Sequence, residues 1–120
     1  MHPSFKRSQR VGELVKRELS AIIFREVKDP GVGEMTITDV AVSDDLRFAK
    51  VYVTTVNDPE ARETTMRALQ RAAGFLRSQL GARIKMRYTP ELRFFYDDTL
   101  DRADRIETLL RKTGGGSAEE

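Results

Sequence analysis

The sequence predicts an α+β fold in which a small mixed three-stranded sheet carries helices on one face. Three observations support this class. An amphipathic helical stretch opens the chain, two runs rich in valine, threonine and tyrosine follow it, and a second amphipathic stretch precedes a third β-like run. The element order is therefore α-β-β-α-β-α, with the second helix as the crossover to the third strand. With 120 residues, the chain has the length of about one domain.

The first helix is predicted over residues 8–27. Its apolar residues recur at helical spacing: Val11, Leu14, Val15, Leu19, Ile22 and Ile23. Asp29-Pro30-Gly31 should stop it, because proline disfavours a helical conformation in the residue before it.

Residues 35–43 and 48–56 are the first two predicted strands. Both are rich in β-branched and aromatic residues, and the turn-forming sequence Asp44-Asp45-Leu46-Arg47 separates them. Two such runs joined by so short a connection predict an antiparallel hairpin.

A second helix should begin at Asn57-Asp58-Pro59-Glu60. Asp58 can accept a capping hydrogen bond, Pro59 suits the first helical position, and Glu60 is favoured by the helix dipole. Its apolar stripe is Met66, Leu69, Ala73, Leu76 and Leu80, and Gly81 is predicted to end it.

The third strand is predicted over residues 91–96, after Pro90, with Leu92, Phe94 and Tyr96 on one side. A last helix should follow over residues 99–112. We expect residues 1–112 to form a single domain and the polar, glycine-rich residues 113–120 to form a flexible tail.

The residues that are missing or rare exclude several classes of site. There is no cysteine, which removes disulfides, thiol nucleophiles and cysteine-based zinc sites. The single histidine, His2, lies at the start of the chain, so imidazole catalysis is not expected. No apolar run approaches the roughly 18 residues of a membrane span. We therefore expect a cytoplasmic protein with no cofactor, no metal and no small-molecule substrate.

Basic residues are concentrated in the middle of the chain. The 27 residues from Thr64 to Pro90 carry six cations and no acid, whereas the net charge of the whole chain is +2. The rest of the chain is therefore net acidic, at −4. If this block folds onto one side, its field should attract polyanions; the alternative is that arginine simply gives a well-solvated helix surface.

On the second helix, Arg67, Arg71, Gly74 and Ser78 fall opposite the apolar stripe. A glycine inside a helix costs about 1 kcal/mol relative to alanine, so Gly74 needs a reason. It could kink the helix around the sheet, or it could let another backbone such as a phosphodiester approach while the two arginines neutralise it. The two interpretations are compatible.

Two further groups of side chains allow alternative interpretations. Asp97, Asp98 and Asp101, with Asp104 one turn later, could hold Mg²⁺. Capping, together with ion pairs from Asp98 to Arg102 and from Asp101 to Arg105, accounts for every one of these acids and is the favoured interpretation. Four strand aromatics could stack on bases, although a core position is favoured, above all for Phe94: Tyr52, Phe94, Phe95 and Tyr96.

Several short motifs also occur in a characteristic order: Arg10-Val11, Glu26-Val27-Lys28-Asp29-Pro30, Asp45-Leu46, Ala49-Lys50-Val51-Tyr52-Val53, and Pro90-Glu91-Leu92 with Phe94 and Asp97. Through them the chain resembles bacterial ribosome-binding factor A over about residues 5–110. The resemblance implies a type II KH-like fold, α-β-β-α(kink)α-β-α, in which an Ala-x-Gly kink between two helices replaces the usual Gly-x-x-Gly loop. Ala72-Ala73-Gly74 matches this kink.

The resemblance also implies a function and partners. Members act in assembly of the small ribosomal subunit: they contact its rRNA, support maturation of the rRNA 5′ end and matter most in the cold. We accordingly expect a monomeric, non-catalytic RNA-binding protein whose partners are the small subunit and its rRNA. The block contributes the predicted RNA-binding residues Arg67, Arg71, Arg77, Arg83, Lys85 and Arg87, and a mobile N-terminal start adds Lys6, Arg7 and Arg10.

Two other functions remain open on the sequence. A small Mg²⁺-dependent nuclease would use Asp97, Asp98 and Asp101 to trim rRNA ends. A protein-interaction adaptor would use the basic block to recognise an acidic partner.

Overall fold

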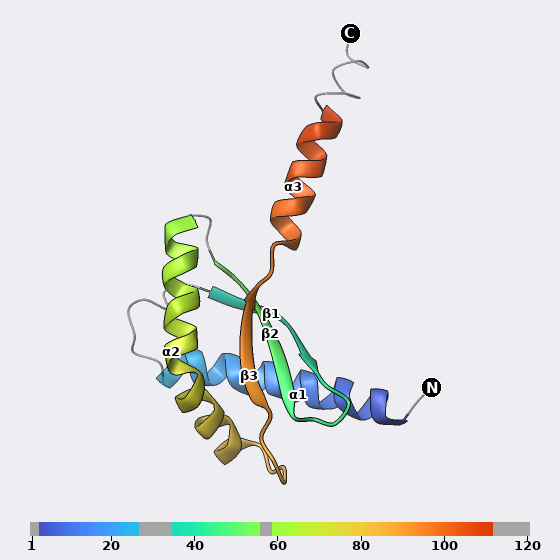
Figure 1. The fold of residues 1–120 in the computed structure, drawn as a ribbon, viewed down its shortest axis with the longest axis vertical. Coiled ribbons are helices and arrows are strands. Elements are labelled where there is room, and N and C mark those ends of the chain that lie inside the picture. The colour runs from blue at the N-terminus through green and yellow to red at the C-terminus, as the bar shows by residue number, and fades with distance from the viewer. Residues whose placement is uncertain (1–2, 27–34, 56–58, 112–120) are drawn as a thin grey trace.

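The computed structural model describes residues 3–26, 35–55 and 59–111 (Figure 1). The elements are α1 (Pro3–Glu26), β1 (Met35–Val42), β2 (Phe48–Thr55), α2 (Pro59–Arg83), β3 (Glu91–Tyr96) and α3 (Thr99–Leu110). The predicted α+β class and element order are confirmed. The predicted helix stop at Asp29-Pro30-Gly31, the cap at Asp58 and the tail lie outside the described residues.

The sheet is mixed, as predicted. Its order is β1-β2-β3, with β2 antiparallel to β1 and parallel to β3. The hairpin turn lies where the sequence placed it, and Leu46 has a positive φ of 62° there. The Ser43 hydroxyl donates to the Asp45 carboxylate at 2.7 Å, which stabilises the turn.

The hydrophobic core lies between one face of the sheet and helices α1 and α2. Each of three elements contributes completely buried side chains: Val15, Leu19 and Ile22 from α1, Ala49, Val51 and Val53 from β2, and Leu69, Leu76 and Leu80 from α2. Figure 1 shows α1 crossing behind the strands and α2 running beside them. The predicted α2 stripe is confirmed in its three leucines, whereas Met66 and Ala73 are only partly buried at the core's edge.

Helix α1 begins earlier than predicted, at Pro3 instead of Ser8. Proline suits the first turn of a helix because its missing N–H has no intrahelical partner there. Lys6 and Arg7, which were expected to precede the first helix, therefore lie in α1 together with Arg10.

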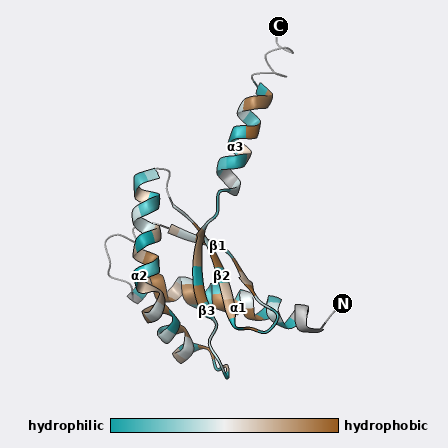
Figure 2. Cartoon of the chain, viewed as in Figure 1, coloured by the Kyte–Doolittle hydropathy of each residue, from teal (hydrophilic) through white to brown (hydrophobic). Residues whose placement is uncertain are grey.

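Helix α3 does not cover the sheet. It projects from the end of β3 (Figure 1), and Figure 2 shows hydrophobic residues along it. Ile106, Leu109 and Leu110 are 58%, 60% and 63% exposed. Only α1 and α2 therefore form the helical layer. The position of α3 was not predictable from its hydrophobic period, because the period shows that a helix has an apolar side and not where that side packs.

Helix α2 continues past Gly81 to Arg83, so the prediction that Gly81 ends it is wrong. A Cβ at Gly81 would lie 2.8 Å from the Thr89 hydroxyl oxygen. Glycine is placed there because the segment leading into β3 passes very close to the helix.

The two helices implied around Ala72-Ala73-Gly74 are one continuous helix, α2, which changes direction along its length (Figure 1). Gly74 is exposed, and a Cβ there would meet nothing within 4 Å. Close packing inside the protein therefore does not explain this glycine. That Ala72, Ala73 and Gly74 cause the bend stays a prediction.

Candidate nucleic-acid interface

Four residues on the outer side of α2 are all exposed, as their spacing predicts: Arg67, Arg71, Gly74 and Ser78. We call them the α2 row. The Arg67 guanidinium lies 3.6 Å from the Glu63 carboxylate, and both side chains are well exposed, at 61% and 74%. Exposed ion pairs of this kind contribute little stability, so Arg67 can exchange Glu63 for another anion at small cost.

Arg77 has a structural role. Its Nε and Nη2 both donate to the backbone carbonyl oxygen of Thr89, at 3.1 and 2.9 Å. This forked contact holds the segment after α2 against the helix.

Arg83 also has a partner within the protein. Its Nη1 lies 3.2 Å from Glu18 Oε1, and the two side chains are 32% and 25% exposed. The pair joins the end of α2 to α1. Of the six predicted cations of the basic block, Arg77 and Arg83 therefore serve the fold.

The segment that Arg77 holds contains the remaining cations of the block. We call residues 84–90 the anchored loop: its ends, Ile84 and Pro90, are buried, and Lys85 and Arg87 are exposed. Arg77 and Gly81 both approach Thr89, so the loop lies against the last turns of α2. We call the α2 row and the anchored loop together the candidate interface.

One residue of the candidate interface escaped the sequence analysis. Tyr88 is 71% exposed, and the Arg87 guanidinium carbon lies 5.7 Å from its ring centroid. The available signal was its position: an aromatic residue directly after a basic one, inside a stretch without acids.

The N-terminal cations do not join this surface. Arg7 and Arg10 are exposed on the first turns of α1, and Figure 1 shows that end of α1 on the side of the sheet away from α2. Lys6 lies in the same part of α1. The structure therefore separates the two predicted basic clusters.

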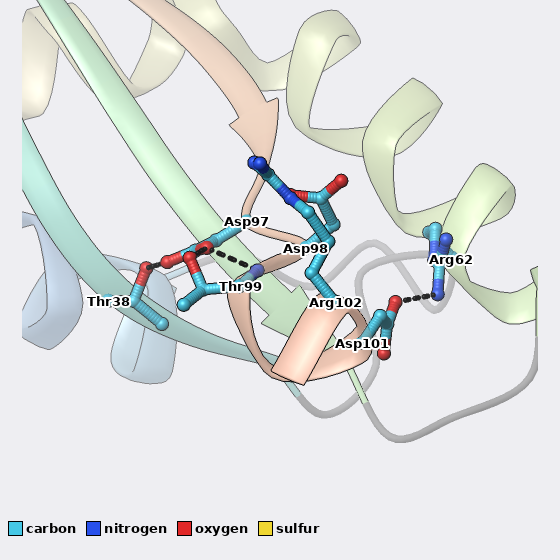
Figure 3. Close-up of polar contacts among 7 residues, drawn as sticks. All are labelled: Thr38, Arg62, Asp97, Asp98, Thr99, Asp101 and Arg102. Atoms are coloured by element: carbon cyan, nitrogen blue, oxygen red, sulfur yellow. Dashed lines mark hydrogen bonds and ion pairs between the residues drawn. The ribbon is translucent and has the colours of Figure 1, made fainter. Parts of the chain in front are cut away.

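The three aspartates at the end of β3 have different partners (Figure 3). Asp97 accepts hydrogen bonds from the Thr38 hydroxyl at 2.6 Å and from the Thr99 amide at 3.0 Å. Asp98 pairs with Arg102 at 2.9 Å, as predicted. Asp101 instead pairs with Arg62 of α2 at 2.8 Å, so its predicted pairing with Arg105 is wrong.

These contacts favour the structural interpretation of the aspartates. Asp97, rather than Asp98, accepts the bond from the first-turn amide of α3. Among residues 3–26, 35–55 and 59–111, no group of three or more potential ligands is placed to hold a metal ion.

Hydrogen bonds from Thr38 and Thr99 lower the pKa of Asp97 to about 2, from an ordinary value of about 3.9. A carboxylate whose pKa is lower in the folded protein stabilises it above the unfolded pKa. We expect this contribution to be complete above about pH 4 and to be lost as the pH falls towards 2. Urea unfolding over this range should show a smaller loss of stability in Asp97→Asn than in the unmodified protein. Asp44→Asn, in the hairpin turn, is the control, and an unchanged pH dependence in Asp97→Asn would contradict the assignment.

The strand aromatics divide between the two faces of the sheet. Phe94 is 6% exposed, which confirms its predicted core position. Tyr52 and Phe95 lie next to each other, with ring centroids 5.8 Å apart, on the face without helices. Tyr96 lies under Arg62, whose guanidinium carbon is 3.9 Å from the ring centroid.

Comparison with known proteins identifies the family. The family model described as "Ribosome-binding factor A" matches residues 7–110. The chain belongs to the ribosome-binding factor A family. The resemblance found in the sequence is thereby confirmed, over almost the same residues.

A relative and two solved structures illustrate the match. Ribosome-binding factor A from Halothermothrix orenii is 50% identical over 107 residues, which cover 89% of this chain and 88% of the relative. The crystal structure of ribosome-binding factor A from Thermus thermophilus has a TM-score of 0.66 and 30% identity, over 74% of this chain and 93% of that one. A Thermus thermophilus ribosome-binding factor A model fitted into a cryo-EM map of a 30S complex gives a TM-score of 0.63 at 30% identity, over 75% of this chain and 94% of that one.

None of the helices in the described part of the chain is both long and apolar enough to span a bilayer.

Proposed function

We propose that this protein binds the small ribosomal subunit through its rRNA and acts, without catalysis, as an assembly factor that supports processing of the rRNA 5′ end in the cytoplasm. Membership of the ribosome-binding factor A family supports this, as does the 30S complex of the Thermus thermophilus relative. The observation that carries the proposal is the candidate interface, where a stretch of chain without acids exposes Arg67, Arg71, Lys85 and Arg87.

The mechanism follows from the chemistry of these side chains. Guanidinium and ammonium groups neutralise phosphates and release condensed counterions, which favours binding. Gly74 and Ser78 leave space between the arginine side chains and the end of the helix, so that a phosphodiester can approach the backbone of α2. Bound in this way, the protein would hold one immature conformation of the rRNA until assembly proceeds.

The salt dependence of binding tests this mechanism. If Arg67, Arg71, Lys85 and Arg87 each neutralise one phosphate, log K should fall linearly with log salt with a slope of roughly −2.8 to −3.6. The measurement is binding of small-subunit rRNA at a series of KCl concentrations. Co-sedimentation with separated small and large subunits identifies the partner. An affinity that does not change with salt, or equal binding to both subunits, would contradict the proposal.

A nuclease assay distinguishes the proposal from the nuclease alternative. Purified protein with Mg²⁺ and labelled precursor rRNA should give no cleavage, because Asp97, Asp98 and Asp101 are engaged by other side chains. Cleavage that Asp98→Asn abolishes would establish an enzyme instead. An adaptor for an acidic protein would keep its partner in nuclease-treated extracts.

A further inference from the structure

The fold leaves two aromatic side chains of the basic block exposed, Phe75 on α2 at 46% and, to a greater extent, Tyr88. The exposed fraction of Tyr88, 71%, contrasts with Phe94, which is 6% exposed a few residues further along the chain. The tyrosine therefore contributes little to the core. An aromatic ring in water beside cations is, however, well suited to stacking on a nucleobase.

The loop that carries Tyr88 is fixed on both sides of the residue. Before it, Ile84 is buried at 3% exposure; after it, the Thr89 carbonyl accepts both bonds from Arg77, and Pro90 is buried. The Glu91 amide then donates to the Arg47 carbonyl at 2.8 Å, which starts β3. A ring presented on an anchored loop loses less conformational freedom on binding than a ring on a free segment.

The charges around the ring indicate an RNA ligand. Arg87 lies 5.7 Å from the ring centroid, and Lys85 is exposed two residues before it. No acidic residue occurs from Thr64 to Pro90, so phosphates would meet no carboxylate from this stretch of chain. A base within a duplex is already stacked on both faces; a side chain stacks readily on a base that is unpaired and splayed out.

We propose that Tyr88 stacks on an unpaired base of RNA, while Lys85 and Arg87 bind the phosphates on either side of that nucleotide. The inference rests on the proposed function and adds a preference for single-stranded segments at one end of the candidate interface. The α2 row would contact the RNA backbone, and Tyr88 would select a position where a base is unpaired.

Substitution of Tyr88 separates stacking from charge. The probes are a short single-stranded oligoribonucleotide of mixed sequence and a duplex of the same length. Tyr88→Leu should bind the single strand roughly 5- to 150-fold more weakly, whereas Tyr88→Phe should bind it like the unmodified protein. Neither variant should change duplex affinity or the salt slope. Because the side chain is mostly exposed, thermal unfolding should be unchanged in both. Phe95→Leu, on the open face of the sheet, is the control for removal of an exposed aromatic ring.

A fluorescence measurement gives a second readout. The chain has no tryptophan, so Tyr88→Trp introduces the only one. The single strand should quench its emission through stacking, and inorganic polyphosphate should not. If Tyr88→Leu binds the single strand as tightly as the unmodified protein, or if both ligands quench equally, the stacking proposal is wrong while the proposed function stands.

Two other outcomes are also decisive. If Tyr88→Leu weakens binding to whole small subunits but not to deproteinised small-subunit rRNA, the residue contacts a ribosomal protein and the proposal is overturned. If the unmodified protein binds no RNA, the proposed function fails, and the stacking proposal fails with it.

Discussion

Replacement of both Arg67 and Arg71 by glutamine is expected to weaken binding of small-subunit rRNA roughly 25- to 60-fold at about 0.1 M salt. Both side chains are exposed on the outer side of α2, one turn apart. Each phosphate contact contributes about 0.7 to 0.9 to the salt slope, so the slope should fall by about 1.4 to 1.8. Removal of Arg67 also leaves Glu63 without its partner on this surface, which adds repulsion towards phosphate. Filter binding at several salt concentrations gives both quantities.

The matched control removes the same charge elsewhere. Arg102 and Arg105 are exposed on α3, outside the candidate interface, so the double variant Arg102→Gln/Arg105→Gln has the same net charge. It should bind rRNA nearly as tightly as the unmodified protein. Equal weakening by the two double variants would mean that overall charge, and not the α2 row, drives binding. Thermal unfolding of both variants shows whether the fold is intact.

Local patterns in the sequence were sufficient to predict most of the fold. The strands and the α2 leucines follow from short-range periodicity, and their burial agrees with it. The sheet is mixed because β2 and β3 pair in parallel, and α2 supplies the crossover connection that a parallel pair requires. What the patterns could not supply was long-range placement: α3 has an apolar side, yet it projects from the sheet.

Prediction of the candidate site was limited for a related reason. A run of cations predicts the sign of a surface, but the role of each cation depends on its neighbours in space. Arg77 and Arg83 bind Thr89 and Glu18, partners that are 12 and 65 residues away in the chain. Arg62, outside the block, instead joins Tyr96 and Asp101. The exposure of a side chain also depends on the fold, which is why Tyr88 was missed.

Gly12→Ala is expected to destabilise the fold by about 2 kcal/mol, although alanine is the better helix former. Gly12 is buried on α1, and a Cβ there would lie 2.8 Å from the carbonyl oxygen of Val40 on β1. The obstacle is backbone, so the clash cannot be relieved by rotating a side chain. Helix α1 would have to move away from β1 and loosen the contacts of Val15 and Leu19 in the core. Urea unfolding measures the loss.

The same substitution at Gly74 should have the opposite effect and serves as the control. A Cβ there would meet no atom within 4 Å, so only the intrinsic helix preference remains, and Gly74→Ala should stabilise the protein by up to about 1 kcal/mol. Both glycines lie inside long helices, so the two substitutions have the same intrinsic helix preference. They differ in what the added Cβ would contact. Stabilisation by both variants would show that α1 does not approach β1 as closely as described. Destabilisation by Gly74→Ala would show that the bend of α2 requires glycine, which is what the predicted kink at Ala72-Ala73-Gly74 implies.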